Sequence, residues 1–355
     1  MWQSLIPEFL SIGIEITLIL PVAIGPHPMG TTTSMGHGQS LRTQQDFLWW
    51  PRRVFERGRI RSRILDRYIT RHDVFHSTYE SVPSQNRIPS VVTIHDLYYE
   101  KFERLNPTRW TNANIARRRY CLARADSIVC VSKATRSDLL ETYPDLVPDI
   151  VTVVHLAAAS LGDEPLMEQE QAIIDAASDR PFLLYVGNRT GYKNFELLAR
   201  GLKDHPNLQD LRVVAVGGEP ADLHRPFLDR LGLASRFLFL GATEDRVLRE
   251  LYMRAVALVS TSLYEGFGLP ILEAQAHGCP VVASAIPAHI EVAGPGAVLY
   301  APDSALELTG ALMSASADRE RLIRTGHENS SKFSWKRAAE ELSSLYRDLV
   351  AHAIS

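Results

Sequence analysis

Two glutamates, Glu265 and Glu273, flank a glycine turn and the start of the helix that should follow it. The apolar run 255–260 predicts a buried strand, and Pro270 suits the first turn of a helix, with Glu273 about one turn further on. A strand, a glycine turn and a helix N-terminus favour anions, because free amides and the helix dipole face the ligand. Carboxylates instead accept hydrogen bonds from hydroxyls. Together they predict a site for a nucleotide diphosphate sugar; the alternative is an ordinary glycine turn with solvated glutamates.

A second glycine loop, in the segment YVGNRTGYKNFE, also follows a predicted strand and opens a helix. Gly187 and Gly191 allow the backbone to turn tightly, and Asn194 is a candidate N-cap. Arg189 and Lys193 are long cations that can reach a diphosphate. The spacing G-x3-G-x-K-N is not that of a Walker loop, so ATP hydrolysis is not indicated. The alternative is a surface loop with two solvated cations.

Two histidines end neighbouring strands of the first half of the chain. His95, followed by Asp96, ends an apolar strand, and its imidazole could hydrogen-bond a sugar hydroxyl at the edge of the sheet. A lone histidine at a strand end is otherwise more often structural. His76 ends the preceding predicted strand and is expected to line the acceptor side. The H-x3-H spacing of His72 and His76 has no further clear ligand, so no zinc site is expected.

Composition describes a globular protein large enough for about two domains. The chain has 355 residues, of which 45% are hydrophobic and 22% charged, and its net charge is -3. Three cysteines lack metal spacing and are expected to be buried, reduced thiols, which favours a cytoplasmic location. We expect no resident cofactor, and a nicotinamide fingerprint is excluded because Ile271 stands where Gly or Ala is required.

Short apolar runs alternate with helical patterns, which predicts an α/β protein with parallel sheets. The expected strands are Ile14–Leu20, Val74–His76, Val91–His95, Ser127–Val131, Val151–Val154, Phe182–Val186, Arg212–Val216, Phe237–Leu240, Ala255–Ser260, Pro280–Ala283 and Ala297–Leu299. We expect two doubly wound, Rossmann-like domains that face each other across a cleft, at residues 1–157 and 158–334. A last helix at 335–355 is expected to cross back to the first domain.

These motifs resemble those of the GT-B glycosyltransferases, in particular the group 1, E-x7-E retaining type of family 4. The resemblance is strongest between Phe182 and Ala285. It implies that Glu265 and His95 hold the donor sugar, that Arg189 and Lys193 grip the diphosphate, and that Glu273 binds the ribose. Of these, His95, Glu265, Arg189 and Lys193 form the expected catalytic set. The other expected donor-binding residues are Gly187, Gly241, Ala242, Gly266, Phe267, Gly268 and Leu269.

The implied activity is transfer of a hexose from a GDP- or UDP-sugar to a saccharide or lipid-linked saccharide, in polysaccharide or glycolipid biosynthesis. Retention of configuration is implied by the resemblance alone. No Asp-x-Asp motif is present, so fixed cations and helix amides are expected to stabilise the leaving group without a metal. The strand and glycine loop that precede the first helix in the family are missing before Trp2. Either the true start lies upstream or the chain is a truncation, so a truncated or non-catalytic donor-binding homologue stays open. A GT-B epimerase or hydrolase of nucleotide sugars is a separate alternative.

The segment Trp49–Arg71 is strongly basic. Its eight arginines against Glu56 and Asp66 give a local charge near +6. Two tryptophans precede the arginines, and this combination suits peripheral contact with anionic lipid. The alternative, which explains the pattern equally well, is a solvated helix face. Binding to nucleic acid is not expected, because no recognised motif accompanies the charge.

Overall fold

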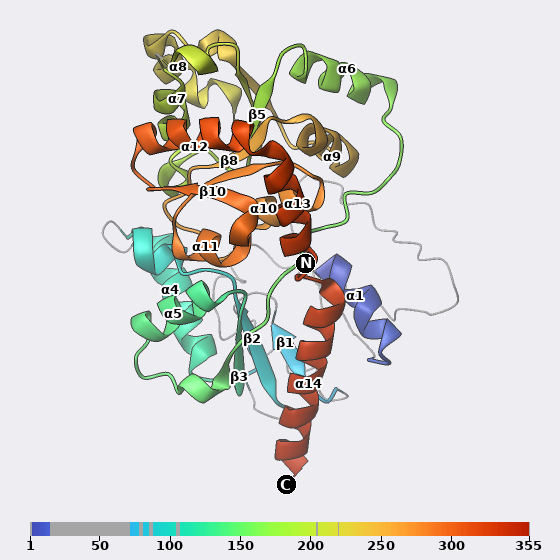
Figure 1. The fold of residues 1–355 in the computed structure, drawn as a ribbon. Helices are drawn as coiled ribbons and strands as arrows, with labels where there is room; N and C mark the ends of the chain where they lie inside the picture. The colour runs from blue at the N-terminus through green and yellow to red at the C-terminus, as the bar shows by residue number, and fades with distance from the viewer. Residues whose placement is uncertain are drawn as a thin grey trace.

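The computed structural model describes residues 2–14, 72–77, 81–84, 88–103, 107–203, 205–218 and 220–354. Two parallel sheets, each flanked by helices, lie one above the other, with the first in the lower half of Figure 1. The expected α/β class, with two Rossmann-like units, is confirmed. The expected strand Ile14–Leu20 and the basic segment Trp49–Arg71 lie outside the described residues, apart from Ile14.

The first sheet has the order β1-β2-β3-β4, and every pairing in it is parallel. Its strands are β1 (Phe75–Ser77), β2 (Ser90–Ile94), β3 (Ser127–Cys130) and β4 (Val151–Val153). Every residue of β2 and β3 is buried, as expected when both faces of a parallel sheet are covered. The helices of this half are α1 (Trp2–Ser11), the π-helix η2 (Tyr99–Glu103), α4 (Arg109–Leu122), α5 (Lys133–Thr142) and η3 (Pro148–Ile150).

Hydroxyl caps fix where two of these helices begin. The Thr108 side chain accepts from the amide of Thr111 and forms a capping box, and Ser132 accepts from the amide of Thr135. Because Thr108 takes the cap position, α4 begins at Arg109. The cap on α5 matters for the site, since α5 begins directly after β3.

The second sheet has the order β10-β9-β8-β5-β6-β7, again with parallel pairs only. Its strands are β5 (Phe182–Val186), β6 (Arg212–Val216), β7 (Phe237–Leu240), β8 (Ala257–Ser260), β9 (Val281–Ser284) and β10 (Ala297–Tyr300). The chain builds outward from β5 through β6 to β7, then returns to add β8 on the other side of β5. The strand order therefore reverses between β5 and β8, and in such sheets ligands bind at the carboxyl ends of the strands beside this point.

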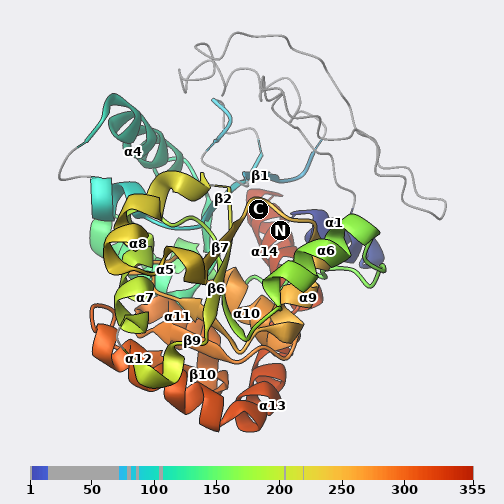
Figure 2. The same ribbon diagram turned by 90° about the horizontal axis from the view of Figure 1, so that it is seen from above.

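Alternate residues of β5 pack into different cores on the two faces of this sheet. Phe182 and Leu184 join the cluster under α6, α9 and α10, whereas Leu183 and Tyr185 join the cluster under α7, α8 and α12. Figure 2 shows these two groups of helices on opposite sides of the sheet. The helices are α6 (Glu168–Ala177), α7 (Phe195–Leu202), α8 (Arg225–Leu231), α9 (Asp245–Arg254), α10 (Leu269–Ala276), α11 (Pro287–Ala293), α12 (Ala305–Ala317) and α13 (Arg319–Ser330). Short turns of helix lie between them at η4 (Gly191–Lys193), η5 (Pro206–Leu208), η6 (Ala221–His224), η7 (Ala234–Arg236) and η8 (Gly294–Gly296).

The last helix, α14 (Trp335–Ile354), runs down beside the first sheet and packs against α1 (Figure 1). The rings of Phe9 and Tyr346 stack with centroids 6.0 Å apart, and the Trp335 indole donates to the Ala158 carbonyl at 3.0 Å. The two ends of the described chain therefore cover the same face of the first sheet. The domain limits at 157 and 334 remain a prediction.

The prediction that Asn194 caps the following helix is correct in position but wrong in mechanism. Asn194 does precede α7, but its backbone is left-handed, with φ 49°, and its side chain makes no capping hydrogen bond. Its amide instead donates to the Pro302 carbonyl at 3.4 Å. Asparagine adopts this conformation more readily than most residues with a Cβ, so Asn194 suits the turn after η4.

Candidate functional site

The two glycine loops singled out in the sequence leave β5 and β8, on either side of the point where the strand order reverses. Two hydrogen bonds join them: the Leu263 amide donates to the Tyr192 carbonyl, and the Thr261 hydroxyl donates to the Lys193 carbonyl, each at 2.7 Å. The loops therefore form one surface, and the residues they carry are held in register with each other.

Lys193 and Glu265 meet on this surface. The Lys193 ammonium lies 2.6 Å from a carboxylate oxygen of Glu265, and the Ser262 hydroxyl donates to the same oxygen at 2.7 Å. Their side chains are 18% and 19% exposed, so the pair is partly desolvated yet open to a ligand. A lysine ammonium is a compact charge on a flexible stem, so it can also reach other oxygen partners nearby.

Arg189 lies on the other side of the first loop. It is 1% exposed, donates to the Pro220 carbonyl at 3.2 Å and stacks over the Phe239 ring at 5.0 Å. The turns around it are tight, since a Cβ at Gly217 would lie 2.3 Å from the Gly187 carbonyl oxygen. The structure thus brings Lys193 to Glu265 and directs Arg189 beneath the loop that follows β6.

Glu273 lies on α10, one turn inside the helix, as expected. The Tyr252 hydroxyl donates to one of its carboxylate oxygens at 3.0 Å. Burial raises the pKa of Glu273 above its ordinary value, the Tyr252 hydrogen bond opposes this, and the charge of Asp245 adds to it. A half-buried carboxylate with one described partner keeps acceptor capacity for hydroxyls.

Gly266 joins this surface to the first domain. A Cβ at this position would lie 1.7 Å from the His95 carbonyl oxygen, so only glycine fits the contact. The Gly266 carbonyl accepts from the hydroxyls of Ser132 at 2.6 Å and Thr135 at 2.8 Å, both at the start of α5. His95 is thereby placed beside the Glu265 turn, although 170 positions separate them in the chain.

The rest of the second loop supports this arrangement. Gly268 takes the N-cap of α10 with φ +109°, a conformation that favours glycine, and its position lies over the buried ring of His289. Burial lowers the pKa of His289, so this ring is neutral at physiological pH. Phe267 packs inward, with its ring 6.2 Å from His155 and 6.1 Å from Phe333, and Leu269 packs against the same core. For these residues only the backbone can face a donor.

The His76 ring is held by two hydroxyl groups inside the first domain, away from the position expected of a residue that contacts the acceptor substrate. Its Nδ1 is 2.5 Å from the Tyr346 hydroxyl and its Nε2 is 2.7 Å from the Thr93 hydroxyl. Burial, with a smaller contribution from the charge of His95, lowers the pKa of His76 to about 3. The ring is therefore neutral and links β1 to α14. Its proposed role on the acceptor side would be exerted through Thr93, which lines the pocket described next.

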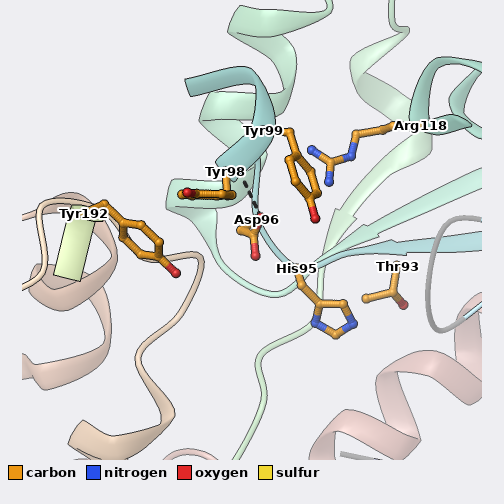
Figure 3. Close-up of a pocket in the computed structure, with 7 residues that line it drawn as sticks. All are labelled: Thr93, His95, Asp96, Tyr98, Tyr99, Arg118 and Tyr192. Carbon is orange, nitrogen blue, oxygen red and sulfur yellow. Dashed lines mark hydrogen bonds between the residues drawn. The ribbon is translucent and has the colours of Figure 1, made fainter. Parts of the chain in front are cut away.

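A pocket of about 140 Å³ lies beside His95 between the two domains. Its lining is Thr93, His95, Asp96, Tyr98, Tyr99 and Arg118 from the first domain and Tyr192 from the second. Figure 3 shows the Tyr192 ring reaching toward Tyr98 from the opposite side, with the Asp96 carboxylate and the His95 ring below Tyr99. Gly241 and Ala242, in contrast, are exposed at the end of β7, two strands from β5.

Two family models match the chain. The model described as "Glycosyltransferase Family 4" matches residues 3–157, and the model described as "Glycosyl transferases group 1" matches residues 167–332. The chain belongs to the group 1, family 4-like glycosyltransferases.

Relatives and solved structures agree with this membership. A D-inositol 3-phosphate glycosyltransferase of Corynebacterium glutamicum is 29% identical over 285 residues, which are 75% of this chain and 68% of that relative. Sucrose-phosphate synthase from Thermosynechococcus elongatus superposes with a TM-score of 0.67 at 22% identity, over 86% of this chain and 81% of the other. Anabaena HepE, crystallised with UDP and glucose, superposes with a TM-score of 0.63 at 16% identity, over 81% and 80% of the two chains. At such identities the structures show a shared GT-B fold.

Several residues of the candidate site had no role assigned from the sequence. Ser262 and Tyr252 hydrogen-bond the two motif glutamates, and Tyr98, Tyr99 and Tyr192 line the pocket. Tyr192 stands between the two residues Gly191 and Lys193 of the first loop, so its place in the motif could have drawn attention to it. Nothing in the order of residues predicts that Tyr98 faces it from another domain.

Two further findings concern the described residues only. No group of three or more histidine, cysteine, aspartate or glutamate side chains among them could hold a metal ion. Within the same ranges, no helix has the length and apolarity needed to cross a bilayer. The three cysteines are free and buried, as expected, and burial raises the pKa of Cys130 and Cys279 to about 12.

Proposed function

We propose that this glycosyltransferase moves a hexose from a nucleotide diphosphate sugar to a saccharide or lipid-linked saccharide, with retention and without a metal ion. The observation that carries the proposal is the meeting of Lys193, Glu265 and the Gly266–His95 contact where the strand order reverses. A cation and a hydroxyl acceptor meet there beside the N-terminus of α10, which is the chemistry that a diphosphate sugar requires.

In this proposal the donor lies along the second sheet. The ribose hydroxyls donate to Glu273, and the diphosphate lies between Lys193 and the start of α10. The sugar hydroxyls donate to Glu265, opposite His95. Gly187, Gly241 and Ala242, at the ends of β5 and β7, would line the nucleotide side through their backbones. Arg189, which is held by Pro220, would reach the diphosphate from below the first loop.

The reaction breaks the bond between the anomeric carbon and the phosphate oxygen and forms one between that carbon and an acceptor oxygen. The leaving diphosphate takes up negative charge, which the Lys193 ammonium and the positive end of the α10 dipole stabilise. The acceptor hydroxyl loses its proton to the departing phosphate oxygen on the same face, so no separate base is needed and configuration is retained. Atoms and charge balance: the products are a glycoside and a protonated nucleoside diphosphate.

Release of nucleoside diphosphate tests the proposal. The chain would be incubated in EDTA with UDP-glucose or GDP-mannose, with and without a panel of saccharide acceptors, and the anomeric configuration of the product read by NMR. Release that requires an acceptor, survives EDTA and yields the α-linked product is the expected result. Release without acceptor would mean a hydrolase or epimerase, and binding without release a non-catalytic homologue. Activity restored only by Mg²⁺ or Mn²⁺ would contradict metal independence.

A further inference from the structure

We propose that the pocket beside His95 selects an uncharged pyranose acceptor, stacked on tyrosine rings from both domains, and rejects phosphorylated acceptors. This inference rests on the proposed function, and it adds the chemical class of the acceptor. It also gives Asp96, Tyr98, Tyr99 and Tyr192 a role in specificity.

The pocket walls are aromatic and cross the domain boundary. The Tyr98 and Tyr192 ring centroids are 4.8 Å apart, although one ring follows β2 and the other follows β5. Phe102 extends the cluster, with its ring 5.9 Å from Tyr98, 5.5 Å from Tyr192 and 5.4 Å from Tyr264. The Tyr264 hydroxyl accepts from the Leu97 amide at 2.7 Å, which ties the cluster to the turn after β2. Flat apolar faces with polar edges suit the C–H faces and hydroxyl rim of a sugar ring.

The charges of the lining argue against a phosphate. Arg118 is the cation among the described lining residues, and it is committed to Glu100, with an N–O distance of 2.6 Å and side chains that are 6% and 5% exposed. The Tyr143 hydroxyl holds the other oxygen of Glu100 at 2.6 Å. Drawing Arg118 away would leave a buried carboxylate without its counter-charge, which is strongly destabilising.

Asp96 adds a negative charge at the pocket, where it accepts from the Tyr98 amide at 2.9 Å. A carboxylate accepts hydrogen bonds from sugar hydroxyls and repels a phosphate. Burial, and then the charges of Glu265 and Asp96, raise the pKa of Tyr192, so its phenol stays protonated and can donate. A donor diphosphate held next to the pocket would add further negative charge. The pocket therefore offers a hydrogen-bond acceptor in Asp96 and a donor in Tyr192, and both favour sugar hydroxyls over a phosphate.

Saturation-transfer NMR with matched probes tests this inference. The probes are methyl α-glucopyranoside, methyl α-mannopyranoside and their 6-phosphates, each added to the full chain saturated with the nucleotide that stabilises it. Neutral glycosides are expected to receive saturation from aromatic protons and to bind at least about tenfold more tightly than their phosphates. Removal of one stacking partner costs about 1 to 1.4 kcal/mol, or fivefold to tenfold. Tyr98→Ala and Tyr192→Ala should therefore weaken glycoside binding by about that factor.

Three controls separate stacking from folding. Tyr98→Phe keeps the ring and is expected to bind glycosides within about threefold of the parent. Phe227→Ala removes a ring on α8, outside the pocket, and should change nothing in this assay. Asp96→Asn keeps an acceptor for the Tyr98 amide but removes the charge. It should therefore reduce the ratio of affinities for neutral and phosphorylated probes.

The two proposals fail in different ways. A chain that no nucleotide stabilises would contradict the proposed function. Normal nucleotide stabilisation together with tighter binding of the phosphorylated probes would overturn this inference alone. So would glycoside binding that is absent, or that is indifferent to both tyrosine substitutions.

Discussion

At the scale of single residues, Lys193 is placed to serve two partners in turn. In the structure it neutralises Glu265, which keeps two partly buried charges compatible with each other. When a diphosphate binds, the ammonium can move to a phosphate oxygen, and Glu265, still held by the Ser262 hydroxyl, becomes available to the sugar. In the proposed function, this one ion pair joins the two loops and would supply both halves of the donor contact.

The substitution Lys193→Gln should lower kcat by about 10²- to 10³-fold, because a donor to developing charge in the transition state is lost. Donor KM should change less than kcat, since part of the binding energy comes from the nucleotide. Steady-state kinetics with the accepted donor measures both quantities. A change confined to KM would mean that Lys193 binds the ground state and transition state equally well.

The charge of Glu273 is partly buried, and this burial lowers the stability of the folded chain at neutral pH. Its folded pKa is raised above the ordinary value, so the folded state loses stability as pH rises through the range between the two values. Glu273→Gln keeps an acceptor for Tyr252 and removes the buried charge. We expect its Tm at pH 7 to be unchanged or to rise by roughly 1–3 °C, while nucleotide affinity falls about tenfold or more. Thermal unfolding with and without nucleotide measures both; a large fall in the Tm of the free protein would contradict this account.

At the scale of elements, the backbone of Gly266 lies at the contact between the turn after β8 and the first domain. The His95 carbonyl lies against the Gly266 Cα, and α5 supplies two hydroxyls to the Gly266 carbonyl. Position 266 therefore has no room for a side chain, because the atom that blocks it belongs to the backbone at the end of β2.

Gly266→Ala should push the turn away from His95 and reduce kcat/KM by more than about 10²-fold, as small misplacements of reacting groups do. The matched control is Gly310→Ala on the exposed face of α12, where nothing lies within 4 Å of the new Cβ. That change should raise the free energy of unfolding by about 0.5–1 kcal/mol and leave kinetics unaltered. Equal kinetics for both alanine variants would mean that the Gly266 contact does not position the site.

The elements were largely predictable, and the contacts between them were not. The strands β5, β6 and β7 have the bounds that their apolar runs predict. For β5 and β6 the reason is that a strand covered on both faces needs mostly apolar residues. β1 lies one residue later than predicted, at Phe75–Ser77, since a three-residue edge strand carries little pattern. The motif glutamates and Lys193 were found from loop chemistry. That Tyr98 faces Tyr192, or that Gly266 meets His95, depends on how two separately formed domains pack, which local patterns do not encode.

At the scale of the whole molecule, a carboxylate on α11 ties the two domains together. Glu291 accepts from the Lys133 and Ala134 amides at 2.8 and 2.9 Å, and from His155 at 2.7 Å. A negative charge at the start of α5 is favoured by the free amides and the helix dipole. Burial alone would raise the pKa of Glu291, but the hydrogen bonds from His155 and the two amides hold it below its ordinary value.

The interactions of Glu291 should make the free energy of unfolding depend on pH in the acidic range. Because the folded pKa of Glu291 is lowered, its contribution is present above about pH 4.5, its ordinary value, and is lost as pH falls through the folded pKa. Glu291→Gln should therefore lower the free energy of unfolding by about 1–3 kcal/mol at pH 7 and by less at pH 4. Glu340→Gln, on the exposed face of α14, should change neither value. Urea unfolding at the two pH values provides the measurement, and a deficit that is the same at both would refute the assignment.

The most direct test of the donor site is thermal stabilisation by UDP, GDP, ADP and their common sugars, in the absence of metal. A ligand that binds only the folded chain adds about 2.7 kcal/mol of stability at a hundredfold excess over Kd. The account predicts a clear rise in Tm with one nucleotide series, greatly reduced in both Glu273→Gln and Lys193→Gln. No rise with any nucleotide in a well-folded sample, or a rise that both substitutions leave intact, would contradict it.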